Sequence, residues 1–234
     1  MSEFNNLITI KQLYCHLIED DNIVYIAYSE YLIFAKKYED TIINCNNTND
    51  NTYAQYEADK LQINTIINKF ITEIKINTIL INNINYKSGD IIKQSKFYKH
   101  INAAFAINIT KNIAKKYKLS GYLRQYNYNG LIFTEGNITD GYDNGIWKYY
   151  RNGILFKEIN YVNNKALLWT YYYKSGYIYE QGTIDNNLKD GLWVSYYDGC
   201  NREISCYGMF KKGERKGEWI YNPSNKYKKQ IKQY

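Results

Sequence analysis

The chain has 234 residues, 28 of them tyrosine, with a formal net charge of +7 and a mean hydropathy of −0.58. This length allows one or two domains. No run approaches the ~20 apolar residues that span a bilayer, and the first residues lack the basic start and apolar stretch of a secretory signal, so we expect neither a helical integral membrane protein nor a secreted one.

The cysteines and the codon-driven composition indicate where the protein works. Cys15, Cys45, Cys200 and Cys206 form no CxxC pair or other metal-ligand spacing, which predicts free thiols in a reducing compartment. Abundant Asn, Ile, Lys and Tyr have AT-rich codons and indicate an AT-rich bacterium, protist or giant virus. The expected location is cytoplasmic, meaning the host cytoplasm or the virion for a viral protein.

Residues 1–117 give mixed signals and predict an N-terminal region with both helices and strands. Leu7–Ile18 and Ile23–Ala35 are compatible with either element. Tyr56–Ile76 favours an amphipathic helix, although Ile, Thr and Asn are poor helix formers. The apolar residues of that segment recur at three- and four-residue steps: Leu61, Ile66, Ile67, Phe70, Ile71 and Ile74.

Residues 80–117 allow two interpretations. The tetrapeptide YKSG at 86–89 recurs at 173–176, and Phe105 lies near a position that holds Trp in the second half of the chain. These matches are compatible with decayed repeat units, the less favoured interpretation. The alternative is a separate capping region, which an open sheet edge requires to prevent aggregation.

Residues 118–222 repeat with a period of 23 residues, set by Gly130, Gly153, Gly176 and Gly199. A period in this range is typical of stacked-repeat proteins. Other positions follow the same period: the four tryptophans Trp147, Trp169, Trp193 and Trp219, with Leu123 one unit earlier; the tyrosines Tyr126, Tyr150, Tyr172 and Tyr196; and the glutamates Glu135, Glu158, Glu180 and Glu203.

Each repeat predicts a β-hairpin. Asn-Gly and Asp-Gly between aromatic and β-branched runs favour a tight turn in which both central residues have positive φ. A second, looser series of polar turns follows at 143–145, 163–165, 186–191 and 211–217, and includes Gly145, Gly191 and Gly217. The units therefore predict a mainly β fold, a single-layer antiparallel meander of stacked hairpins.

The repeat unit resembles the MORN repeats, in particular their longer-period variant found in bacterial antitoxin-labelled proteins and giant-virus proteins. The matching text covers residues 144–161, 166–184 and 189–208, with a diverged unit at 120–138 and a half unit at 216–222. Departures are Leu123 at a Trp position, Ile159 at a Gly position and Ala166–Leu168 in place of Asp-Gly. The resemblance implies an elongated antiparallel sheet that serves in scaffolding, self-association or membrane-surface binding.

The C-terminal end carries most of the net charge. Residues 209–234 hold eight basic residues against two acidic ones: Lys211, Lys212, Arg215, Lys216, Lys226, Lys228, Lys229 and Lys232. We expect residues 223–234 to form a basic tail. These cations could dock on anionic lipid, contact nucleic acid phosphates, or only keep the last edge strand soluble; nucleic acid is the least favoured of the three.

No catalytic, cofactor or metal site emerges from the sequence. His16 and His100 have no evident partners, and Glu19–Asp21 fits an acidic turn better than a metal site. The repeated glutamates fit backbone or lysine partners better than a cation site. We therefore expect a non-enzymatic scaffold for protein–protein interaction or self-association, without a small-molecule substrate. The alternatives are an adaptor on anionic membranes and an antitoxin-like protein that neutralises a partner.

Overall fold

The computed structural model describes residues 4–44, 53–71, 76–199, 201–222 and 229–234. The chain divides into two units by its contacts, Met1–Phe133 with Ile138–Gly141 and Thr134–Asn137 with Tyr142–Tyr234. The division falls inside the first repeat hairpin, later in the chain than the boundary expected after residue 117.

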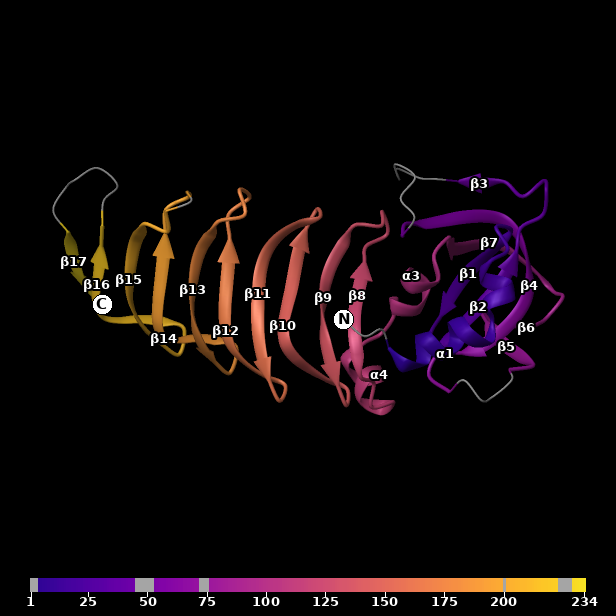
Figure 1. The fold of residues 1–234 in the computed structure, drawn as a ribbon, viewed down its shortest axis with the longest axis horizontal. Coiled ribbons are helices and arrows are strands. Elements are labelled where there is room, and N and C mark those ends of the chain that lie inside the picture. The colour runs from indigo at the N-terminus through magenta and orange to yellow at the C-terminus, as the bar shows by residue number, and fades with distance from the viewer. Residues whose placement is uncertain (1–3, 45–52, 72–75, 200, 223–228) are drawn as a thin grey trace. The chain divides into compact units, whose positions relative to one another are not determined.

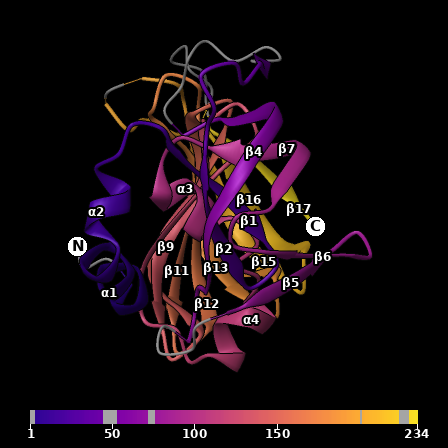
Figure 2. The same cartoon turned by 90° about the vertical axis from the view of Figure 1, so that its right-hand side faces the viewer.

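The first unit contains four strands that close into a ring. The hairpin β1 (Ile23–Tyr28) and β2 (Tyr31–Lys36) is joined on both sides by other strands. β7 (Ile91–Tyr98) pairs with β1, and the long β4 (Gln55–Asn68) pairs with both β7 and β2. Figure 2 shows β4 and β7 side by side. The short β3 (Ile43–Asn44) extends the sheet beyond β4.

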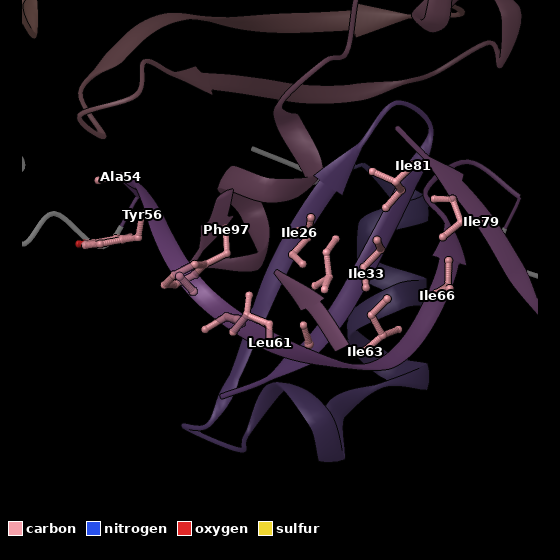
Figure 3. Close-up of a cluster of buried hydrophobic side chains, with 14 residues drawn as sticks. Ile26, Ile33, Ala54, Tyr56, Leu61, Ile63, Ile66, Ile79, Ile81 and Phe97 are labelled. Atoms are coloured by element: carbon pink, nitrogen blue, oxygen red, sulfur yellow. The ribbon is translucent and has the colours of Figure 1, made fainter. Parts of the chain in front are cut away.

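A buried aliphatic core lies inside this ring. Figure 3 shows Ile26, Ile33, Leu61, Ile63 and Phe97 directed toward one another from four strands. The separate hairpin β5 (Thr78–Ile81) and β6 (Ile84–Lys87) adds two further isoleucines to the same cluster. Each ring strand therefore has one face in the core.

The predicted helix over Tyr56–Ile76 is wrong, because β4 occupies most of that segment. Buried residues alternate along the strand at Tyr56 and Ala58 and again at Leu61 and Ile63. Ile66 and Ile67 depart from this alternation, because the register against β2 shifts between Ile63 and Thr65. Their β-branched side chains still favour a strand. Residues 72–75 of the expected helix lie outside the described residues.

The remaining segments of the first unit resolve the open alternatives. The segment Leu7–Ile18 lies in two helices, α1 (Asn5–Leu13) and α2 (Cys15–Ile18). The segment Ile23–Ala35 forms the β1–β2 hairpin. Between residues 80 and 117 lie β6, β7, α3 (Ile101–Ala106) and α4 (Lys111–Lys116), none of which belongs to the repeat sheet. Gly89 and Gly176 of the duplicated tetrapeptide share a positive φ, 93° and 88°, so they share a local turn only.

The repeats form one antiparallel meander of ten strands, which confirms the predicted sheet. Successive strands lie next to each other in chain order (Figure 1). They are β8 (Gly121–Tyr126), β9 (Ile132–Thr139), β10 (Tyr142–Arg151), β11 (Ile154–Val162), β12 (Lys165–Tyr172), β13 (Ile178–Asp185), β14 (Leu188–Tyr196), β15 (Ile204–Lys211), β16 (Glu214–Tyr221) and β17 (Gln230–Gln233). The expected basic tail therefore contains a strand of the sheet.

The sequence predicts tight turns at the glycines of the 23-residue series. Most of the tight turns instead lie at the other ends of the strands. Two consecutive residues with positive φ occur at Asp140–Gly141, Asn163–Asn164, Asn186–Asn187 and Lys212–Gly213, next to or within the series predicted to be loose. In the 23-residue series, Asn152–Gly153 has this geometry, whereas at Gly130 and Gly176 the glycine alone has positive φ. Asparagine tolerates the left-handed region, so Asn-Asn replaces Asn-Gly at little cost.

Strand bulges take up the uneven spacing of the tryptophans. The register shifts between Asn160 and Tyr161, between Gly182 and Ile184, and between Gly208 and Met209. Gly145, Gly191 and Gly217, expected in the looser turns, lie inside strands with φ of 67°, 93° and 63°. Extra residues before a tryptophan are therefore accommodated within the strand.

Candidate functional site

A row of tryptophans runs across one face of the sheet in the second unit. The register places Trp169 opposite Ile159 and Gly182, and Trp193 opposite Gly182 and Gly208. Since facing residues in a sheet share a face, all four tryptophans lie on one side. We call this side the Trp face.

Three of the tryptophans cover a glycine of the preceding strand. A Cβ atom added to Gly136, Gly182 or Gly208 would lie 2.4–2.5 Å from the indole of Trp147, Trp193 or Trp219. Each of these indoles also donates Nε1–H to a backbone carbonyl: Trp147 to Asn137 at 2.9 Å, Trp193 to Thr183 at 2.7 Å and Trp219 to Met209 at 3.2 Å. The glycine thus permits both the contact and the hydrogen bond.

The repeat that contains Trp169 breaks this pattern. Ile159 stands at the glycine position, and its side chain is buried opposite Trp169. Trp169 is only half-buried, and its buried Nε1 has no hydrogen-bond partner among the described residues. The ring instead packs under Lys157, whose Nζ lies 3.6 Å from the ring centroid.

Cations also lie over the rings of Trp193 and Trp219, both of which are buried. Lys189 Nζ lies 4.0 Å from the Trp193 ring centroid and the Arg215 guanidinium lies 4.2 Å from that of Trp219. Lys189 also forms an ion pair of 2.7 Å with Glu180. On the Trp face, basic side chains therefore cover tryptophan rings, and cation–π contacts of this kind contribute about 0.5–2 kcal/mol each.

Two of the repeated glutamates bond to repeated tyrosines on the other face. Tyr150 donates its hydroxyl to Glu135 at 2.6 Å, and Tyr172 donates to Glu158 at 2.7 Å. In the next unit Tyr196 accepts from Gln181 at 3.1 Å. Burial, with a smaller contribution from the Glu158 hydrogen bond, raises the pKa of Tyr172.

The expected partners of the glutamates are therefore correct in part. Glu180 pairs with a lysine as predicted, whereas Glu135 and Glu158 pair with tyrosines of the next strand. Glu203 is exposed. Leu123 is buried at the Trp position of the first repeat, and Tyr126 stacks on Tyr53 with ring centroids 4.4 Å apart.

Large aliphatic side chains lie exposed on the face opposite the Trp face. The residue before each of the first three tryptophans is Ile146, Leu168 or Leu192, with exposed fractions of 54%, 37% and 51%. Met209 faces Leu192 across the β14–β15 pair and is 49% exposed. We call these four residues the aliphatic row.

The sequence carries a signal for the aliphatic row that is separate from the Gly, Trp, Tyr and Glu periods. The position between the bulge glycine and Trp holds Ile146 and Leu192 in complete units, although it faces away from the indoles. Glu218 takes this position in the last unit. The glycines under the tryptophans are likewise visible in the sequence only as a frequent glycine after the glutamate.

No known family model and no curated protein sequence matches this chain. Function must therefore be argued from the arrangement of its side chains.

The basic residues of the C-terminal end lie in two groups. Lys211, Lys212, Arg215 and Lys216 surround the β15–β16 turn, and Lys229 and Lys232 belong to or precede β17. Lys211 pairs with Asp190 at 3.3 Å and Lys216 with Glu214 at 3.0 Å, so part of the charge is compensated. Lys226 and Lys228 lie outside the described residues.

The polar residues considered for catalysis lie on or next to two elements, α2 and α3. His16 belongs to α2, Glu19–Asp21 follow that helix, and the Nδ1 of His100 accepts from the Asn102 backbone N–H at 3.1 Å at the start of α3. Among the described residues, no cluster of three or more His, Cys, Asp or Glu is arranged to hold a metal ion. The described helices are all too short or too polar to cross a membrane.

Proposed function

We propose that this chain is a non-enzymatic, MORN-like repeat scaffold that binds a protein, either a partner or a second copy of itself, through the aliphatic row. The observation that supports the proposal is the repeated exposure of a large aliphatic side chain at the same position of successive units. Leu192 and Met209 are direct neighbours, whereas Asn160 lies between Ile146 and Leu168. Exposed apolar surface is typical of interaction sites.

The aliphatic row alone supports weak association. Burying one large aliphatic side chain contributes roughly 1.5–3 kcal/mol, so four contribute at most about 6–12 kcal/mol. Association costs about 4–15 kcal/mol in lost freedom. The tyrosine–glutamate pairs beside the row therefore have to contribute contacts, which fits a face that is part aliphatic and part aromatic.

Size-exclusion chromatography with light scattering, over a range of protein concentrations, tests self-association. Pull-down with the purified chain, followed by binding of the purified captured protein, tests a partner. We expect Ile146→Ser and Leu192→Ser to weaken the association, since each removes apolar surface from the row. Ile154→Ser is the matched control, because Ile154 is 46% exposed outside the row.

The proposal also predicts that Tyr172→Ala and Tyr196→Ala weaken the same association without unfolding the chain. Association that is unchanged in the Ile146, Leu192 and tyrosine variants would exclude this face as the interface. Toxin neutralisation is the narrower form of the proposal, and the identity of the captured protein decides it.

A second candidate function is docking on anionic membranes through the basic end. Lys211 and Lys216 keep 65% and 56% of their side chains exposed despite their ion pairs, and each cation near an anionic surface contributes about 1 kcal/mol. Flotation with phosphatidylserine vesicles tests it. Binding that survives Lys211, Lys212, Arg215 and Lys216→Glu would exclude this group of residues as the membrane site.

A further inference from the structure

A cavity of about 210 Å³ lies within the first unit. Helices α1 and α3 and strand β8 contribute its apolar wall, formed by Phe4, Leu7, Phe105 and Leu123. Engineered cavities of ~150 Å³ with similar apolar linings bind benzene. This cavity is therefore large enough for an aromatic ring with a short substituent.

The departure at Leu123 explains why there is space at this point. In three later repeats, the indole of a tryptophan occupies the space above the sheet at the equivalent position. Leu123 has a smaller side chain, and among the described strands β8 is the last of the sheet on this side. Helix α3 packs there instead, and Gln125 Nε2 donates to the carbonyl oxygens of Ala106 at 3.3 Å and Ile109 at 3.2 Å.

A pair of stacked rings forms another wall of the cavity. Tyr53 and Tyr126 are parallel to within 3°, with centroids 4.4 Å apart. Burial raises the pKa of Tyr126 to about 12, so its hydroxyl stays neutral at physiological pH. Rings of this kind favour a planar ligand that packs against an edge or a face.

The charge at the cavity comes from Arg124. Among the residues that line it, all of which the structure describes, Arg124 alone carries a full charge, and its side chain is exposed. Its guanidinium lies 5.8 Å from the Tyr122 ring centroid, which also lines the cavity. A guanidinium binds a carboxylate through two parallel hydrogen bonds.

We propose that this cavity binds a small planar aromatic carboxylate, with the ring against Phe105 and Leu123 and the carboxylate on Arg124. This binding activity goes beyond the proposed scaffold function, because it involves none of the residues of the aliphatic row.

Isothermal titration calorimetry of the full chain with phenylacetate and with its neutral analogue phenylacetamide tests the proposal. We expect saturable binding of one phenylacetate per chain, at least about tenfold tighter than phenylacetamide, because a hydrogen bond to a charged group is stronger than a neutral one. Arg124→Met should remove the preference. Arg151→Met is the matched control, since Arg151 is exposed and lies 4.2 Å from the Phe156 ring outside the cavity.

Leu123→Phe should abolish binding of both compounds by filling the cavity, in a chain whose circular dichroism remains that of the parent. Two results would overturn the proposal: no saturable binding of phenylacetate at millimolar concentration, or a preference for phenylacetate that survives in Arg124→Met. Because the Arg124 side chain is exposed, we expect its replacement to leave the fold intact, and the circular dichroism of Arg124→Met checks this.

Discussion

At the scale of single residues, the absence of a side chain at Gly136, Gly182 and Gly208 is what positions the tryptophans. An indole flat against a strand needs a neighbour without a Cβ atom, and three units supply one. Ile159 shows what happens otherwise, because Trp169 keeps its place in the row but its Nε1 has no hydrogen bond among the described residues.

Gly182→Ala is expected to destabilise the second unit by about 1–3 kcal/mol, because the added methyl group overlaps the Trp193 ring. Urea denaturation measures the loss, and Trp193 emission should shift to the red. Gly176→Ala is the control: it has a positive φ but open space around it, so it should lower stability without the shift. An unshifted spectrum in Gly182→Ala would contradict the packing described.

The indole N–H of Trp169 is expected to exchange with deuterium faster than those of Trp147 and Trp193. Theirs are held by hydrogen bonds to carbonyl oxygens, and that of Trp169 has no such bond among the described residues. Two-dimensional NMR of the indole N–H signals checks this. Equal protection of the three signals would mean that Trp169 has a bonding partner.

Lys69 gives the first unit a predictable pH dependence. Its side chain is fully buried, and Nζ donates to the Ile107 carbonyl at 3.0 Å. Burial lowers the pKa of Lys69 to about 7. The unfolded chain therefore holds more protons above pH 7, so the free energy of unfolding rises with pH from about 7 toward the unfolded pKa near 10.4.

Hydrogen exchange of β4 amides between pH 7 and 9.5, corrected for intrinsic rates, measures this slope. Lys69→Met should remove the part of this slope that Lys69 contributes, because position 69 then holds no titrating group. A wild-type chain with the same slope as Lys69→Met would show that the amine stays charged in the folded state.

At the scale of elements, local chemistry is readable from the sequence and long-range pairing is not. The hairpins of the second unit follow from turn residues and aromatic runs that are close in sequence. The helix prediction fails at β4 because Ile63, Ile66 and Ile67 recur at helical steps although they are β-branched, and because its partners β2 and β7 lie far along the chain. The tryptophan positions of the site can be predicted from the repeat. The aliphatic row could not be predicted, because the sequence does not show which face of the sheet stays exposed.

The Asn186–Asn187 turn offers an element-scale test. Both residues have positive φ, 50° and 62°. Asn187→Gly should leave stability unchanged or raise it slightly, whereas Asn187→Ala should cost about 1–2 kcal/mol because alanine disfavours the left-handed region. Urea midpoints followed by tryptophan fluorescence compare the two. A stable Asn187→Ala would contradict the two-residue turn.

At the scale of the whole molecule, the second unit has the organisation of a stacked array in which each strand pairs with its sequence neighbours. Equivalent turns also bond to one another. Tyr173 donates its hydroxyl to the Tyr196 carbonyl at 2.9 Å, and the Asn164 N–H donates to the Asp143 carbonyl at 3.2 Å. Stability in such arrays is a sum of unit and neighbour contributions.

Deletion of residues 164–186 should therefore leave a folded, shorter sheet. It removes β12 and β13 and joins Asn163 to Asn187, which recreates an Asn-Asn turn between β11 and β14. Deletion of residues 164–174 alone is the control, because it places β13 beside β11 and pairs two strands that both lack a tryptophan. Circular dichroism should show strand signal for the first deletion and loss or aggregation for the second; the reverse would exclude modular stacking.

The exception at Ile159 also gives the sheet a mechanical weak point. When the second unit is stretched along the row of strands, every seam resists through its ladder of backbone hydrogen bonds. At three of the four seams where a tryptophan follows its partner strand, β9–β10, β13–β14 and β15–β16, the indole adds a bond to the preceding strand. Among the described residues, the fourth of these seams, between β11 and β12, lacks it. Among these four seams, the one between β11 and β12 should therefore rupture first under force.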